Sequence, residues 1–298
     1  MKTKLVLSLM LFAFVGGYAQ DYAFKVLVNK GKNEVKTSGG WQAVKVGTSL
    51  KSPDELKVSE NAYVGLVHVS GKPLEVKEAG KYKVDALAAK VSGGSSVLNK
   101  YTDFILSSNA TKKNNLAATG AVHRGLKQVH IYAPASQNQQ QVIYNDEIIL
   151  NWDTQQAPGP YIITINSLFD DELFRAETKD SFLKINLADS RFTNEDNINL
   201  IITPKNDAGK ASEKYALKRA SKADKERIKN LLGEIATQVS DPNALNMLYL
   251  AGFYEENGLL IDAATAHRKA ILLEPDVPYY VEKYNDFLSR NGLLAPKE

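Results

Sequence analysis

Between residues 21 and 91, apolar and polar residues alternate along short runs that end at turn residues. The stretch "YAFKVLVNKGKNEVK" alternates until Gly31, and "NAYVGLVHVSGKPLEVKEAGKYKV" alternates between turns at Ser70-Gly71 and Ala79-Gly80. Turns spaced roughly 8–12 residues apart along alternating runs are typical of a small β-sandwich or β-barrel. The pattern therefore predicts a first all-β domain over residues 20–91.

A second alternating region covers residues 146–220. The run "EIILNWD" places Ile148, Leu150 and Trp152 on one face, and "PYIITINSLFDDELFRAET" predicts a hairpin that turns at Asp170-Asp171. Further strands are expected in "SFLKINLADSRF" and "NINLIITPKNDAGKASEKYALKR". We therefore expect a second small all-β domain of the sandwich class.

The intervening residues 92–145 have the composition of a connector. "SGGSS" is a flexible break, and "ASQNQQQ" is a polar loop. Apolar residues between them fall at helical spacing, at Val97, Leu98, Tyr101, Phe104 and Ile105. A short amphipathic helix is expected there, capping an end of one of the β domains.

The apolar period changes to a helical one over residues 221–298. "SKADKERIKNLLGEIATQV" begins with a capping Ser221, and "NALNMLYLAGFYEENGLLIDAATAHRKAILLEP" predicts two helices with a tight turn at Gly258. "VPYYVEKYNDFLSRNG" predicts one more amphipathic helix. The fold class expected is multi-domain α+β, in which two small all-β domains precede a C-terminal helical stack.

The first twenty residues predict a signal peptide and an exported protein. Lys2 and Lys4 precede the apolar Leu5–Val15, and Gly17-Tyr18-Ala19 is a small-x-small cleavage site. With cleavage after Ala19, the missing cysteines remove both disulfides and lipid attachment at the new N-terminus. We expect a periplasmic protein and leave open its association with an outer-membrane assembly.

Net charge and hydropathy limit the classes of partner that are expected. The formal net charge is +3, and loss of Lys2 and Lys4 leaves 35 basic against 34 acidic residues. Such a balance predicts no nucleic-acid partner. No later stretch approaches 18 apolar residues, so direct membrane insertion is not expected.

Residues 20–91 resemble the FecR-like β domain. The residues that carry the resemblance are Trp41, Gly47, Leu50, Asp54-Glu55-Leu56, Ala62-Tyr63 and "GKPLEV". The following "EAGKYKVDAL" resembles exported proteins of the Bacteroidetes type. This resemblance implies a periplasmic sensing or docking module.

Residues 146–220 resemble the immunoglobulin-like family with features of fibronectin type III. The matching residues are Leu150-Asn151-Trp152, Tyr161, Leu187 and "PKNDAGKASE". The position of the family's corner tyrosine holds Asn197. The resemblance implies a domain that spaces or presents other modules.

Residues 244–275 resemble one tetratricopeptide repeat. Its pattern is carried by Leu250, Ala251, Tyr254, Gly258, Ala263, Ala270 and Pro275, while Met247 and His267 depart from it. The resemblance implies a protein-binding helical pair that stacks between helices 222–239 and 278–291.

Mapped onto that repeat, the expected partner-binding positions are Leu245, Leu248, Glu255, Glu256, Tyr279 and Glu282. The alternative is that helix 222–239 covers Leu245 and Leu248. Reversal of Glu255 and Glu256 to lysine is expected to weaken partner capture and to leave thermal stability almost unchanged.

No catalytic residue, metal site or cofactor is predicted. The sequence has no G-x-S-x-G, no H-E-x-x-H and no cysteine, and its histidines are scattered at positions 68, 123, 130 and 267. The carboxylates of Asp170, Asp171 and Glu172 are expected to be a solvated turn, with calcium binding as the alternative. Trp41 and Trp152 lie in strand patterns, so core packing is expected for both.

The function expected from these observations is non-enzymatic. We expect an exported protein-interaction or scaffold protein of the bacterial cell envelope, with an unidentified protein partner. Glycan or peptidoglycan binding through Trp41 or Trp152 is the alternative, followed by an envelope hydrolase.

Overall fold

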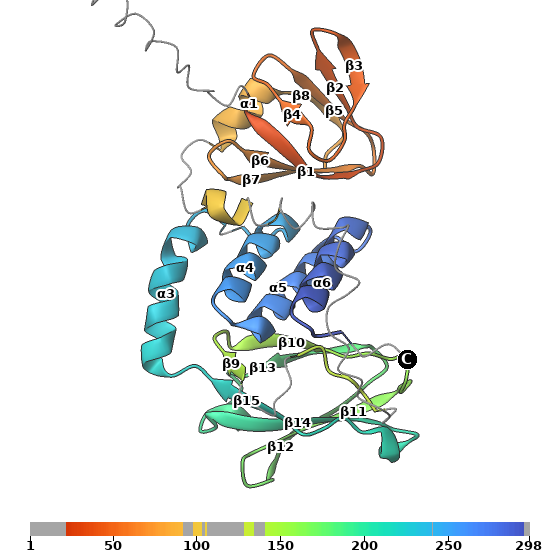
Figure 1. Ribbon diagram of the computed structural model, residues 1–298, viewed down its shortest axis with the longest axis vertical. Coiled ribbons are helices and arrows are strands. Elements are labelled where there is room, and N and C mark those ends of the chain that lie inside the picture. The colour runs from red at the N-terminus through yellow and green to blue at the C-terminus, as the bar shows by residue number, and fades with distance from the viewer. Residues whose placement is uncertain are drawn as a thin grey trace, which may run out of the picture. The chain divides into compact units, whose positions relative to one another are not determined.

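The structure, a computed structural model, describes residues 22–91, 98–102, 105, 128–133, 141–239 and 241–294 (Figure 1). The predicted signal peptide, His123 and most of the polar loop "ASQNQQQ" lie outside the described residues. The chain divides into two compact units, of which one comprises Met1–Val69 and Val76–Ser92 and the other Ser70–Glu75 and Gly93–Glu298.

Residues 24–83 form two four-stranded sheets, and all of their strands belong to the first unit except β7, of which only Val76 does. Their orders are β4-β1-β6-β7 and β3-β2-β5-β8. The strands are β1 (Phe24–Lys30), β2 (Glu34–Thr37), β3 (Gly40–Ala43), β4 (Ser49–Leu50), β5 (Glu55–Val58), β6 (Tyr63–His68), β7 (Pro73–Val76) and β8 (Gly80–Lys83), followed by helix α1 (Val84–Lys90). Both sheets contribute fully buried side chains, among them Val26 and Leu66 from one and Leu56 from the other. The all-β character predicted for this region is confirmed, apart from α1.

In the second unit, a five-stranded sheet of order β12-β11-β14-β15-β9 accompanies the two-stranded sheet β10-β13. The strands are β9 (Gln141–Ile143), β10 (Glu147–Asn151), β11 (Tyr161–Asn166), β12 (Glu172–Thr178), β13 (Phe182–Asn186), β14 (Asn197–Pro204) and β15 (Tyr215–Arg219). Trp152 and Tyr161 lie in the core between them, with ring centroids 5.4 Å apart. Core packing of Trp152, which is 1 % exposed, is thereby confirmed.

The second unit ends in four helices at the predicted places. They are α3 (Lys222–Ala236), α4 (Ala244–Glu256), α5 (Leu260–Leu273) and α6 (Pro278–Arg290). Gly258 has a φ of 72°, a conformation that glycine adopts without steric cost, and this permits the tight turn between α4 and α5. Among the described residues, none of the helices has the length and apolar character needed to cross a bilayer.

Helix α5 packs against α4, against α6 and also against strand β10 (Figure 1). Ile261 of α5 belongs to the same buried cluster as Trp152 and Tyr161 of the β strands. The sequence predicts that α5 stacks only among helices and that a domain boundary falls at residues 220–221. In the structure, the chain on the two sides of that position shares one core.

The connector helix is described at residues 98–102 and 105, and it packs against α4. The hydroxyls of Thr102 and Tyr249 are 2.7 Å apart, and the rings of Tyr101 and Phe253 meet edge to face at 6.3 Å. Its packing partner is therefore a helix of the tail, where the sequence analysis expected the end of a β domain.

Candidate functional site

The six residues predicted to bind a partner do not form one open groove. Leu245 and Leu248 are 0 % and 2 % exposed, so neither contributes to the surface. The backbone N–H of Leu245 donates a hydrogen bond of 2.7 Å to the carboxylate of Glu75, which belongs to the same unit. These two leucines are core residues of the second unit.

The two glutamates at the end of α4 are engaged by other side chains. Glu255 accepts hydrogen bonds from the guanidinium of Arg290, at 2.7 Å to both of its oxygens, and from the side-chain amide of Asn291. Glu256 pairs with Lys100 at 2.9 Å. Burial, followed by the hydrogen bond to Glu256 and the negative charge of Glu256, raises the pKa of Tyr101. Arg290 therefore ties the C-terminal ends of α4 and α6 together.

The two predicted positions on α6, Tyr279 and Glu282, are more exposed than the buried leucines of α4. Tyr279 is partly buried, with the ammonium of Lys283 5.3 Å from its ring centroid. Glu282 is exposed. The exposed carboxylates of Glu256 and Glu282 are thus the accessible part of the predicted partner-binding set.

The expectation that Trp41 packs in a core is wrong. Its side chain is 39 % exposed, because strand β3 lies at the edge of its sheet and carries Trp41 on the face opposite to the buried Val35 and Leu56. Cross-strand register places Trp41 opposite Lys36, and Lys36 opposite Glu55. An indole this accessible is a candidate contact for a ligand.

Three lysines surround the exposed indole. The ammonium groups of Lys36, Lys57 and Lys81 lie 6.0, 5.8 and 5.7 Å from the Trp41 ring centroid. They come from β2, β5 and β8, and Lys57 is also bound to Glu34 at 2.8 Å. Each contact is within the distance at which a cation is attracted to the face of an aromatic ring. We call Trp41 and these three lysines the Trp41–lysine cluster.

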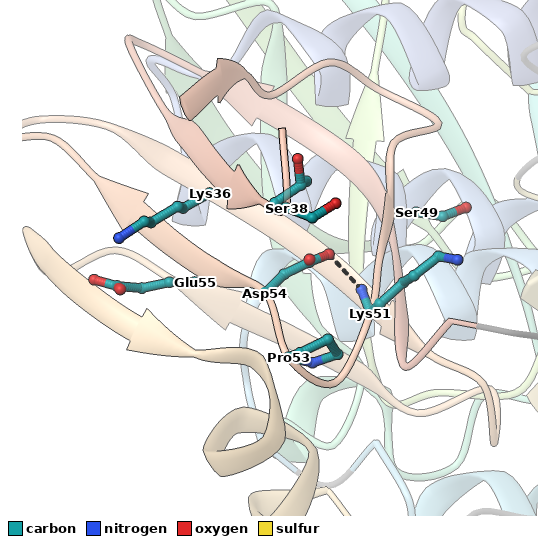
Figure 2. A pocket seen from close by; sticks show the side chains of 8 residues that line it. Lys36, Ser38, Ser49, Lys51, Pro53, Asp54 and Glu55 are labelled. Atoms are coloured by element: carbon teal, nitrogen blue, oxygen red, sulfur yellow. Dashed lines mark hydrogen bonds between the residues drawn. The ribbon is translucent and has the colours of Figure 1, made fainter. Parts of the chain in front are cut away.

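A shallow depression of about 560 Å³ adjoins the cluster and shares Lys36 with it (Figure 2). Hydroxyls and charged groups dominate its lining, which consists of Lys36, Thr37, Ser38, Ser49, Lys51, Pro53, Asp54 and Glu55. Figure 2 shows the backbone N–H of Lys51 donating to the carboxylate of Asp54, at 2.7 Å. Because Asp54 is only 7 % exposed, this bond fixes the loop that presents Lys51.

Charge is segregated along the chain. Residues 22–91 contain 12 lysines against seven acidic residues, whereas residues 92–298 contain 23 basic against 26 acidic residues. The nearly balanced charge of the whole chain does not reveal this difference between its two parts. The excess of positive charge in residues 22–91 favours the approach of anionic ligands to this part of the chain.

The described histidines are packed individually. His68 contacts the Phe24 ring at 5.1 Å, and Nε2 of His130 lies 3.0 Å from the carbonyl oxygen of Leu293. His267 is buried against the rings of Tyr284 and Phe287, and burial, with the positive charges of Arg290 and Lys283, lowers its pKa to about 3. Within the described ranges, no group of three or more potential ligands is placed to hold a metal ion.

The carboxylates at the β11–β12 turn are bound by neighbouring side chains. Asp170 forms an ion pair with Lys214, and Glu172 forms one with Arg175. Asp171 accepts a hydrogen bond from the Ser167 hydroxyl at 3.3 Å. These contacts fit the expected solvated turn.

The sequence pattern does not single out the three lysines of the cluster. Lys36, Lys57 and Lys81 each occupy a polar position of an alternating run, which is ordinary for a strand with one exposed face. Their significance depends on the strand order β3-β2-β5-β8, which brings separate runs next to Trp41.

Comparison of the chain with protein-family models and with curated proteins gives no match. The resemblances to FecR-like, immunoglobulin-like and tetratricopeptide proteins accordingly stay predictions.

Proposed function

We propose that this chain is an exported, non-enzymatic binding and scaffold protein of the bacterial cell envelope, and that its first unit carries the ligand contact. The observation that carries the proposal is the partly exposed Trp41 with three ammonium groups around it. Aromatic side chains with accessible surface are enriched at binding sites because they contribute large contact areas at low entropic cost. The Trp41–lysine cluster adds charge to such a contact.

The second unit supports the scaffold part of the proposal. Helix α5 shares a core with the β strands, and its Asp262 and Thr265 accept hydrogen bonds from the backbone N–H groups of Tyr144, Asn145 and Ile149, so helices and strands form one body. A rigid body of this kind is suited to holding other modules at fixed spacing. Glu256 and Glu282 are proposed as a further contact for a protein partner of the tail.

Binding to isolated envelope fractions tests the proposal. Purified protein is incubated with outer-membrane vesicles and with sacculi, and the bound fraction is compared for wild type and Trp41→Ala. Leu168→Ala serves as a matched control, because Leu168 is also a large exposed apolar residue, at 50 %. We expect loss of binding for Trp41→Ala alone. If all three proteins bind the fractions equally, Trp41 is not the ligand contact. If none of them binds, the proposed envelope binding is wrong.

Glycan or peptidoglycan binding is the second candidate function. It is favoured by one observation: the exposed indole adjoins a depression lined by the hydroxyls of Thr37, Ser38 and Ser49. Sugar rings combine apolar faces with hydroxyl edges, and both kinds of surface are present here.

A further inference from the structure

We infer that the ligand of the Trp41–lysine cluster is an acidic glycan, a polysaccharide with carboxylate or phosphate groups along its chain. This inference rests on the proposed function, in which the cluster is the ligand contact. It specifies the class of ligand and the group that each part of the site recognises.

The spacing of the positive charges supports a ligand with repeated anionic groups. Three ammonium groups lie within 6.0 Å of one ring centroid, and all three fall within the footprint of a short oligosaccharide. Lys51 also lines the depression that adjoins the cluster, together with the carboxylates of Asp54 and Glu55. A single small anion would contact one or two of these lysines, whereas an acidic chain that crosses the sheet contacts all of them.

The indole and the hydroxyls distinguish a sugar chain from a simple polyanion. Trp41 offers an apolar surface against which the C–H face of a pyranose ring packs. In the depression that shares Lys36 with the cluster, Ser38 and Ser49 offer groups that both donate and accept hydrogen bonds, as sugar hydroxyls require. Ammonium groups then form charge-assisted hydrogen bonds with the acidic substituents.

The strands that carry these residues are held in a fixed register. Lys36, Glu55 and Lys83 lie opposite one another on β2, β5 and β8, and Glu34, Lys57 and Lys81 form the neighbouring row. Glu55 lies between Lys36 and Lys83, whereas Lys57 and Lys81 lie directly opposite each other. The register therefore holds two lysines of the cluster side by side on one face of the sheet.

The probes for the test are polygalacturonate as the acidic glycan, dextran as the neutral glycan, polyglutamate as the acidic peptide and single-stranded DNA. Binding is followed by the emission of Trp41, with Trp41→Phe as the blank that leaves only the buried Trp152. A cluster variant carries Lys36→Gln, Lys57→Gln and Lys81→Gln. A control variant loses the same charge elsewhere in the unit, through Lys32→Gln, Lys45→Gln and Lys90→Gln.

We expect polygalacturonate to shift the emission and dextran to leave it unchanged. The cluster variant should bind polygalacturonate about tenfold more weakly or worse, and added salt should weaken wild-type binding, since several ion pairs are involved. The control variant should bind like the wild type. Thermal unfolding of each variant, followed by circular dichroism, confirms that the fold is retained.

Each other outcome has a definite meaning. An equal loss in the control variant, or binding of polyglutamate or DNA as tight as that of polygalacturonate, would overturn the assignment of an acidic glycan. The proposed function would still stand if Trp41→Ala abolished binding to envelope fractions. If no probe binds, and Trp41→Ala binds envelope fractions as well as the wild type, both the acidic-glycan ligand and the proposed role of the cluster are refuted.

Discussion

The carboxylate of Asp262 on α5 accepts two hydrogen bonds from Asn145, one from the backbone N–H at 2.8 Å and one from the side-chain amide at 2.7 Å. A third bond comes from the backbone N–H of Tyr144, at 2.9 Å. Asp262 is 0 % exposed, and burial raises its pKa against the opposing effect of these donors. A helix residue thus organises the turn between β9 and β10.

Replacing Asp262 with alanine should destabilise the second unit strongly. Three donors would lose their acceptor in a buried place, and we expect the free energy of unfolding to fall by about 2–4 kcal/mol. Denaturant unfolding of the whole chain measures the change. Asp241→Ala, at an exposed position before α4, should shift the midpoint little. A similar small shift for Asp262→Ala would show that solvent replaces the lost acceptor.

Thr265 should protect one amide of strand β10. Its hydroxyl oxygen accepts a hydrogen bond of 2.9 Å from the backbone N–H of Ile149. We expect Thr265→Val to cost about 1–2 kcal/mol and to speed hydrogen exchange at Ile149. Thr265→Ser keeps the hydroxyl and should preserve the protection. Unchanged exchange at Ile149 in Thr265→Val would contradict this role.

His267 should make the protein sensitive to mild acid. Its folded pKa of about 3 lies below the ordinary value of 6.5, so between these pH values the unfolded chain binds a proton that the folded chain does not. The free energy of unfolding should therefore fall as pH falls from 6.5, by up to about 1.4 kcal/mol per pH unit from this residue. Above pH 6.5 the residue adds no pH dependence.

The variant His267→Phe tests this linkage, because a phenyl ring can occupy the site against Tyr284 and Phe287. Between pH 6.5 and 5, the free energy of unfolding should fall by about 2 kcal/mol less in this variant than in the wild type. Parallel slopes for wild type and His267→Phe would show that another group titrates.

Charge reversal at Glu255 should affect stability, contrary to the expectation from the sequence. The Glu255 side chain is 10 % exposed and is bound by Arg290 and Asn291, so a lysine there faces a like charge. We expect Glu255→Lys to lower the free energy of unfolding by roughly 1–3 kcal/mol and Glu256→Lys to change it much less. The double variant Glu255→Lys/Arg290→Glu should recover part of the loss. No recovery would mean that the pair contributes by packing alone.

Iodide quenching probes the Trp41–lysine cluster without any ligand. Trp152 is 1 % exposed, so collisional quenching of the emission comes from Trp41. Neighbouring ammonium groups should concentrate iodide and repel caesium. Removing the charges of Lys36, Lys57 and Lys81 should lower the iodide quenching constant and raise the caesium constant. Equal constants before and after would place the ammonium groups away from the indole in solution.

The sequence predicted where the strands and helices lie better than it predicted which of them pack together. Alternation and turn residues located the β strands, and Gly258 located the break between α4 and α5. The exposure of Trp41 was not predictable, because alternation does not say which face of an isolated strand is inward.

The contact between α5 and the β strands was missed for a related reason. Asp262, Thr265 and Lys269 recur at helical spacing, and a polar stripe of this kind is ordinarily a solvated face. Here they meet the backbone of Tyr144–Asn145, the Ile149 amide and the Glu147 carboxylate. Such polar docking leaves no hydrophobic signature in the sequence.

The cover that α5 places over β10 has a consequence for a shortened chain. Strand β10 pairs with β13 on one side, and on the other its Ile149 amide is bound by Thr265. Cleavage before α4 would uncover a strand that contains Ile148, Ile149 and Leu150, together with its unpaired backbone groups. Strands exposed in this way recruit strands from other molecules. Proteolytic loss of the helices should therefore yield aggregates of the second unit, and release of an intact β-sandwich is not expected.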